Sequence, residues 1–331
     1  MIRCMCMALS CILSCFWMSC VGTSAFVTRC GYGLCRFGSK KGMMAMVYPD
    51  VGEWIPEILF ENDRVLVINK PSGIEHHNNE KDQSEGVLTR IRHLQREARF
   101  PYDGRLYGVH RLDKVTSGIL MFAKDKESAG LISKRLREKS VTKFYFAVSS
   151  KRPKRRKQGV IKGDMIKARR GAWQLTRGNS NPAVTRFYTA GLGHLNEIFD
   201  CGLTEDEKEV LPRTAVLFQP ITGRTHQLRV ASKSEGMPIL GDVLYGGKVG
   251  GFNNRVCLHS SALHFTLGNA IDDEICVLCP PPFSHLWQGQ EQNIKVEGAL
   301  EDIFFSLMKK HCTNTSLLNK IESRLDIPLF P

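Results

Sequence analysis

Short apolar segments of two different periodicities are the feature that most limits what this 331-residue chain can fold into. Segments that are apolar along their length and close in a turn, such as "RVLVINKPSG", are typical of buried strands. Segments that repeat apolar residues every three or four positions are typical of helices packed on one face. Strands are predicted at 119–124, 143–148, 184–189 and 213–219, and helices at 84–98, after Asp125, and around Leu300 to Leu307. This irregular mixture, without internal repeats or strict β-α-β alternation, predicts an α+β fold around a largely antiparallel mixed sheet flanked by helices and loops.

One turn places opposite charges directly before an expected strand. In "YGVHRLDKVTSGILMFAKD", residues 107–125, Arg111 and Asp113 stand two positions apart, ahead of the apolar run 119–123. A turn residue in a surface ion pair is the simplest interpretation of Asp113 from these residues alone. An alternative is a charged group presented to a ligand.

A second turn presents a cationic group in a similar way. In "LFQPITGRTHQLRVASKSEGMPILGDVLYGG", residues 217–247, Thr225 is predicted to cap a helix that carries His226 and Arg229 on neighbouring faces. An aspartate held by an arginine stays ionised, because the opposite charge lowers its pKa. Such a carboxylate suits a nucleophile and not a general acid.

Residues 1–49 differ in kind from the rest of the chain. They contain no Asp or Glu, five Lys or Arg, and seven of the twelve cysteines. Arg3, the mostly apolar run 5–21 and the small residues before Phe26 predict a signal peptide. "TSAF" resembles the cleavage motif of two-part plastid presequences, so we expect a plastid (chloroplast) address, with the mitochondrion, secretion or a retained membrane anchor as alternatives. The predicted domains are therefore a presequence, 1–49, and one folded domain, 50–331, without stable membrane association once mature.

Positive charge is concentrated in one internal strip. Residues 151–170, "KRPKRRKQGVIKGDMIKARR", contain ten basic residues and one acidic residue, Asp164. Together with the presequence this strip accounts for all of the formal net charge of +13, because the remaining residues sum to −1. The strip predicts a contact with a polyanion such as nucleic acid, and the alternative is a solvated loop.

Metal and redox chemistry find little support in the sequence. Cys276 and Cys279 form a CxxC without a second pair nearby, which favours buried strand cysteines over a zinc site. His110, Asp113 and His226 are an alternative ligand set. No phosphate-binding or dinucleotide-binding glycine motif is present, so we expect neither metal nor cofactor.

Six blocks make the chain resemble the RluA-like family of RNA pseudouridine synthases. They are "ILFENDRVLVINKPSG", "GVHRLDKVTSGILMFAK", "KFYFAV", "PITGRTHQLRV", "GMPILGDVLYG" and "VCLHSSALHF", in this order between residues 57 and 287. The resemblance implies the pseudouridine synthase fold, with a catalytic cleft across the sheet. It also implies RNA as partner, and we expect a monomer.

Residue roles follow from the same resemblance. Asp113 would be the catalytic aspartate that attacks the flipped uridine, and Arg229 would pair with it. Tyr145 would lie against the uracil ring and take part in proton handling, while Arg111 would help to occupy the stack that the base leaves. The further predicted substrate-binding residues are His110, Arg224, His226, Lys154, Arg155 and Arg156.

Substrate choice is where this chain departs from its relatives. Many of them carry an S4-type RNA-binding domain before the catalytic domain, and the segment between the presequence and Glu57 is too short for one. The expected substrate is structured organellar RNA, either rRNA or tRNA. The rival functions are a catalytically idle RNA-binding protein on the same fold and a metal-dependent hydrolase.

Overall fold

The structure is a computed structural model that describes residues 54–80, 83–193, 209, 211–249, 255–268, 273–283 and 293–325. Residues 45–331 form one compact unit, and the predicted presequence lies outside the described residues. Within the described ranges, no helix is both long and apolar enough to cross a membrane.

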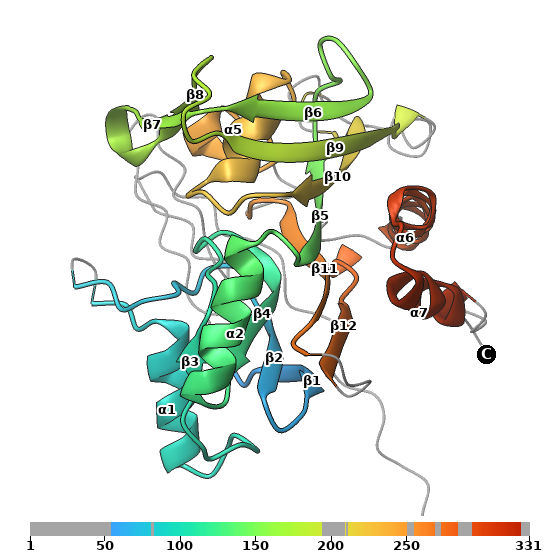
Figure 1. The fold of residues 1–331 in the computed structure, drawn as a ribbon. Helices are drawn as coiled ribbons and strands as arrows, with labels where there is room; N and C mark the ends of the chain where they lie inside the picture. The colour runs from blue at the N-terminus through green and yellow to red at the C-terminus, as the bar shows by residue number, and fades with distance from the viewer. Residues whose placement is uncertain are drawn as a thin grey trace, which may run out of the picture. The chain divides into compact units, whose positions relative to one another are not determined.

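A ten-stranded sheet forms the centre of the fold (Figure 1). Its main path runs β1-β2-β4-β11-β5-β10-β9-β6, with β12 paired to β11 and β3 to β4. The strands are β1 (Glu57–Glu61), β2 (Val65–Lys70), β3 (Tyr107–Gly108), β4 (Ser117–Ala123), β5 (Thr142–Ser149), β6 (Gln158–Gly163), β9 (Ala183–Gly191), β10 (Thr214–Pro220), β11 (Leu258–Thr266) and β12 (Glu274–Leu278). A separate hairpin consists of β7 (Met165–Lys167) and β8 (Trp173–Leu175), joined by the short helix η1 (Arg169–Gly171). The helices are α1 (Val87–Arg96), α2 (Lys126–Arg137), α5 (Gln227–Ser234), η3 (Val243–Tyr245), α6 (Asn293–His311) and α7 (Thr315–Leu325).

Strand direction confirms the predicted α+β class. All pairs in the described sheet are antiparallel except β4 with β11, which are parallel over two residue pairs, His259–Ser117 and Ser260–Gly118. The strands predicted from apolar runs are present, each within a few residues of its expected bounds. The one parallel contact places the start of β4, and with it the turn that carries Asp113, against the centre of the sheet.

The sequences of β2 and β4 are apolar at consecutive positions because both faces of these strands are covered by other elements. Leu66 belongs to a buried cluster that includes Ile91 of α1, whereas Val67 belongs to a second cluster with Ile132 of α2. Successive strand residues point to opposite faces, so each strand needs apolar residues at every position.

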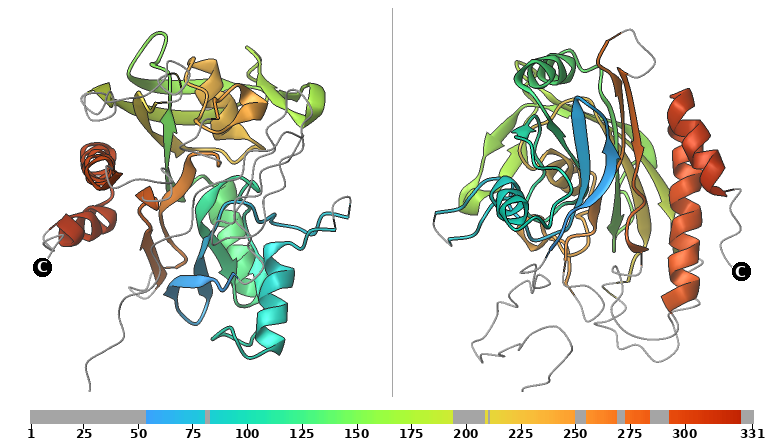
Figure 2. Two further views of the ribbon diagram at one scale, coloured as in Figure 1. Left: turned by 180° about the vertical axis from the view of Figure 1, so that it is seen from behind. Right: turned by 90° about the horizontal axis from the view of Figure 1, so that it is seen from below.

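The same alternation directs Phe146 and Tyr145 of β5 to opposite faces of the sheet. Phe146 packs against Phe304 of α6, with ring centroids 5.4 Å apart and planes at 87°. Its neighbour Tyr145 therefore points to the opposite face, away from α6. Helices α6 and α7 lie together on one side of the sheet in both views (Figure 2). The face that carries Tyr145 is thus left to the loops that form the site.

Candidate active site

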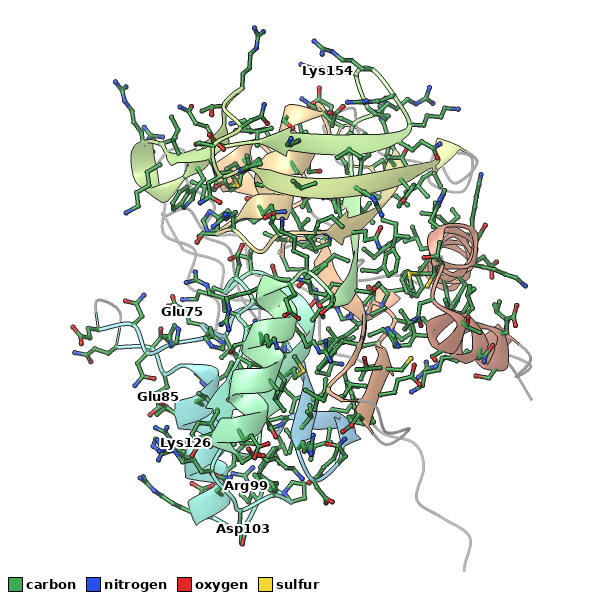
Figure 3. The ribbon with its side chains drawn as sticks, in the orientation of Figure 1. Glu75, Glu85, Arg99, Asp103, Lys126 and Lys154 are labelled. Carbon is green, nitrogen blue, oxygen red and sulfur yellow. The ribbon has the colours of Figure 1, made fainter. Side chains whose placement is uncertain are left out.

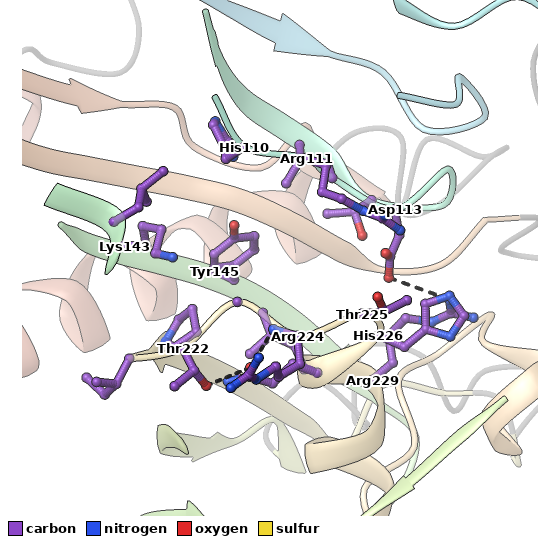
Figure 4. Close-up of a pocket in the computed structure, with 18 of the residues that line it drawn as sticks. His110, Arg111, Asp113, Lys143, Tyr145, Thr222, Arg224, Thr225, His226 and Arg229 are labelled. Carbon is purple, nitrogen blue, oxygen red and sulfur yellow. Dashed lines mark hydrogen bonds and ion pairs between the residues drawn. The ribbon is translucent and has the colours of Figure 1, made fainter. Parts of the chain in front are cut away.

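A pocket of about 340 Å³ opens beside the start of β5 and the end of β10 (Figure 4). Its walls include residues 109–113 and Thr116, which precede β4, and residues 220–229, which lead into α5. The volume is typical of a site for a small molecule or a single base. The structure brings seven predicted site residues together here: His110, Arg111, Asp113, Tyr145, Arg224, His226 and Arg229.

Asp113 lies in the turn before β4, as predicted, but its side chain is only 17% exposed. The Asp113 carbonyl accepts a hydrogen bond from the Thr116 amide at 3.0 Å, and Leu112 is buried in the core. Gly118 has a φ of 101°, and a Cβ there would lie 2.3 Å from the Ser260 carbonyl oxygen. Only glycine permits this close approach, which positions the turn against β11.

Arg229 binds two carboxylates, and the stronger contact is to a residue that the sequence reasoning missed. Its Nε and Nη2 donate to Asp242 at 2.7 and 2.8 Å, whereas its Nη1 lies 3.6 Å from Asp113 Oδ2. Asp242 is fully buried and the Arg229 side chain is 6% exposed. Burial lowers the pKa of the Arg229 guanidinium. The hydrogen bonds with Asp242 and the negative charges of Asp242 and Asp113 have a larger combined effect, so the pKa is raised. The predicted Asp113–Arg229 pair is therefore present, with Asp242 as the residue that orients the arginine.

Lys70 supports the turn that carries Asp113, although the sequence predicted only that it ends a strand. It is fully buried, and its ammonium donates to the carbonyls of Pro71, Ile74 and Lys114 at 2.8, 3.0 and 3.4 Å. Burial lowers the pKa of Lys70 to about 7, although the negative charge of Asp113 opposes this shift. Lys70 therefore ties the turn after β2 to the turn that carries Asp113.

Tyr145 lies within the pocket with only 8% of its surface exposed. Burial raises the pKa of its phenol to about 12, although a hydrogen bond with Ser260 opposes the shift. The phenol is therefore protonated at neutral pH. Its flat ring can contact a base, and its O–H can donate a hydrogen bond.

His110 is neutral in this site. Its Nε2 accepts a hydrogen bond from the Met121 amide at 2.9 Å, which leaves the proton on Nδ1. Burial lowers its pKa to about 3, with a smaller contribution from the charge of Lys143. His110 can therefore contact a substrate as a neutral ring but does not supply positive charge.

The prediction that Thr225 caps the helix is wrong. The N-cap of α5 is His226, in the left-handed conformation with φ of 57°, and no side chain caps the helix. Instead, the Gln227 side chain folds back and accepts hydrogen bonds from the Thr222 hydroxyl and the Arg224 amide at 2.8 and 2.9 Å. The Gln227 side chain thus holds the turn before α5 and does not cap the helix.

Tyr245 connects α5 to the β7–β8 hairpin. Its hydroxyl lies 2.8 Å from His226 Nδ1 and accepts a hydrogen bond from the Trp173 amide at 2.9 Å. The Arg229 guanidinium lies 4.9 Å from the centre of the Tyr245 ring, which adds a cation–π contact. Asp242 and Tyr245 both belong to the block "GDVLYG", so the motif was visible in the sequence although their contacts were not.

The basic strip does not join the pocket. None of its described residues lines the cavity, and Lys154, Arg155 and Arg156 are exposed on the loop before β6 (Figure 3). The Lys154 amide donates to the Glu235 carbonyl, which places this loop at the far end of α5. The eight residues of α5 span about 12 Å. The first part of the strip, residues 151–157, is therefore separated from the pocket by the length of α5. Its last part is closer, because Lys167 pairs with Trp173, whose amide binds the Tyr245 hydroxyl beside His226.

No group of three or more potential metal ligands occurs among the described residues. Cys276 and Cys279 are buried, and their thiols carry pKa values that burial raises to about 11 and about 12. Both cysteines are buried as predicted, but only Cys276 lies in a strand, β12, and Cys279 directly follows it; Cys201 lies outside the described ranges.

Comparison with known proteins identifies the class. The family described as RNA pseudouridylate synthase matches residues 64–234. An "Uncharacterized RNA pseudouridine synthase" of Haemophilus influenzae is 38% identical over 231 residues, which cover 70% of this chain and 90% of that protein. The "Ribosomal large subunit pseudouridine synthase C" of Escherichia coli K12 is 34% identical over 222 residues, 63% of this chain. The match spans about three fifths (61%) of that relative's length.

Solved structures agree with this assignment. Human RNA Pseudouridylate Synthase Domain Containing 4 has a TM-score of 0.50 at 25% identity and covers 69% of this chain and 90% of its own. Human RNA Pseudouridylate Synthase Domain Containing 1 has the same TM-score and identity, with coverage of 74% and 95%. The chain belongs to the RNA pseudouridylate synthase family, which is a family of isomerases. Within it, the relatives confirm the RluA-like type that the six sequence blocks predicted.

Proposed function

We propose that this protein converts specific uridines of structured RNA to pseudouridine, with Asp113 as the nucleophile and ribosomal RNA as the favoured substrate. The observation that carries the proposal is the pairing of Asp113, at the edge of the pocket, with the buried Arg229, which Asp242 holds in place. A carboxylate beside a fixed guanidinium is held in one position at the cavity, as a nucleophile must be.

The reaction needs no net redox change. The N1–C1′ bond breaks, the uracil turns, the C5–C1′ bond forms, and the proton that leaves C5 is balanced by protonation of N1. Asp113 attacks the uridine and is released when the new bond forms. The carboxylate and its counterion are present on the chain's own residues, and the proton that leaves C5 passes to water.

Access to the base requires extrusion from the RNA stack, which costs a few kcal/mol. Stacking on an aromatic ring such as Tyr145 returns about 1–3 kcal/mol. Arg111, which is exposed where it borders the pocket, is proposed to fill the space that the base leaves. Tyr145 acts here as a protonated phenol, because its pKa of about 12 prevents it from serving as a resting phenolate base.

Phosphate contacts at the basic strip supply further binding energy. Residues 151–157 of the strip and the pocket lie at opposite ends of α5, so an RNA that contacts both must extend along this helix. We propose rRNA because several relatives are named for the large ribosomal subunit, with tRNA as the alternative. We further propose that the mature protein acts as a monomer in the plastid.

The experiment is a single-turnover assay of Asp113→Asn on RNA whose uridines carry tritium at C5. Loss of the C5 hydrogen releases tritium, so isomerisation is measured directly. The variant should fold and bind RNA but release no tritium, whereas the exposed control Asp103→Asn should match the wild type. Turnover near wild type by folded Asp113→Asn would refute the proposal.

A further inference from the structure

Lys143 is a cation inside the pocket to which neither the motifs nor the comparisons give a role. It precedes Tyr145 by two residues on β5, so both side chains point to the same face. Strand β10 pairs with β5 only as far as Phe218–Tyr145, so Lys143 lies beyond the part of β5 that β10 covers. Both residues line the pocket, and Figure 4 draws Tyr145 between Lys143 and Asp113.

The described part of the chain provides no partner for the Lys143 ammonium. The residue is half-buried, and no hydrogen bond or ion pair joins it to another described residue. The only carboxylate among the residues that line the pocket is Asp113, which pairs with Arg229. Burial lowers the pKa of Lys143, and nothing opposes that shift. A half-buried ammonium without a partner is unfavourable, so its natural complement is an anion that arrives with the substrate.

Arg137 adds a second cation to the same part of the pocket. It is the last residue of α2, it lines the cavity, and it is exposed at its edge. Its neighbours Lys134 and Arg135 pair with Glu138, whereas no described residue pairs with Arg137. A guanidinium and an ammonium together match a phosphate group, which accepts hydrogen bonds from both.

We propose that Lys143 and Arg137 form a phosphate subsite that binds an RNA phosphodiester next to the flipped uridine. The inference rests on the proposed function, which makes RNA the ligand. Bases carry no charge, so the phosphodiester is the anion that RNA brings into the pocket. Lys143 lies about 7 Å along β5 from Tyr145, a distance on the scale of one nucleotide.

The test measures binding in the Asp113→Asn background, where no turnover intervenes. RNA is prepared with one neutral methylphosphonate at a time on each side of the target uridine. One position should weaken binding about tenfold or more, as expected for a lost charge-assisted hydrogen bond. Lys143→Met should weaken binding of unmodified RNA and show a smaller further loss at that position, because only Arg137 then contacts the phosphate. Lys126→Met, which removes an exposed lysine at the start of α2, is the control and should leave the position-dependent loss intact.

Two further readouts separate a binding role from a structural one. Lys143→Met should unfold at the same temperature as the parent protein or higher, because it removes an unpaired half-buried charge, and Lys143→Arg should retain most of the affinity. The salt dependence of binding should fall by a slope of about 0.7, the value for one phosphate contact on a single strand. An equal methylphosphonate loss in parent and Lys143→Met, or an unchanged salt slope, would overturn the subsite. Failure of the proposed function would appear separately, as an absence of tritium release by the wild-type protein.

Discussion

Removal of Asp242 should destabilise the protein and disable the site without touching the nucleophile. Asp242→Asn keeps the size of the side chain but removes its charge, which leaves Arg229, only 6% exposed, with Asp113 at 3.6 Å as its remaining counterion. Breaking a buried ion pair from one side costs about 3–5 kcal/mol. At about 2–4 °C per kcal/mol, the melting temperature should fall by roughly 6–20 °C.

The reciprocal variant removes the arginine and leaves the buried carboxylate without its counterion. Arg229→Met leaves Asp242 fully buried beside the half-buried Asp113, without the guanidinium that serves both. We expect a loss at least as large as that of Asp242→Asn. The double variant Arg229→Met with Asp242→Leu should lose less than the sum of the single changes, because no unpaired charge then remains.

The assay combines urea unfolding with single-turnover tritium release at saturating RNA. Below its melting temperature, Asp242→Asn should bind RNA with affinity near wild type but isomerise more slowly, because Arg229 no longer holds Asp113 in one position. Additive stability losses in the double variant would show that the pair is not coupled. Wild-type turnover by Asp242→Asn would show that the orientation of Arg229 does not matter, and the account of the site given above would fail.

Three further predictions follow from other regions. Replacing residues 154–157 by glutamine should weaken RNA binding and reduce its salt slope by roughly 0.7 per lost phosphate contact, while the single-turnover rate at saturating RNA stays unchanged; an unchanged slope would show that the strip stays in solvent. Lys70 has a folded-state pKa of about 7 against 10.5 for the free side chain, so the unfolded chain holds more protons above pH 7. The free energy of unfolding should therefore rise between pH 7 and 9, by up to about 1.4 kcal/mol per pH unit, and Lys70→Met should lose this slope in urea titrations. Fusion of residues 1–49 to a fluorescent reporter should direct it to the plastid, and a charged residue in place of Phe26 should stop it before the stroma; secretion or mitochondrial labelling would reject this address.

Local structure could be predicted well because it depends on nearby residues. The apolar runs of β4, β5, β9 and β10 have the composition of buried strands, and their bounds lie within a few residues of the prediction. The start of α5 is the exception. Thr225 has the chemistry of a cap, but the helix begins one residue later, after His226 in the left-handed conformation, and the Gln227 side chain binds the preceding turn at Thr222 and Arg224. A residue preference for the cap position carries no information on this backbone geometry.

Distances between remote segments were harder to predict. The family motifs placed Asp113 near Arg229, but they did not indicate that Arg229 gives its two short hydrogen bonds to Asp242. Lys70 looked like the end of a strand, whereas burial and three carbonyl partners make it a support of the catalytic turn. Motif order along the chain carries no information on which of two carboxylates lies closer to a guanidinium.

The sequence by itself determined the elements, the family and the set of charged residues from which the site is built. Periodicity and turn chemistry act over a few residues, and six ordered blocks suffice to recognise a family. Which of those charges meet depends on the tertiary structure: it joined Arg229 to Asp242, buried Lys70, left Lys143 without a partner among the described residues, and placed residues 151–157 of the basic strip at the far end of α5 from the pocket. The physical reason is that burial and the distance between charges depend on how the sheet brings remote segments together, and they set the energy of each ion pair.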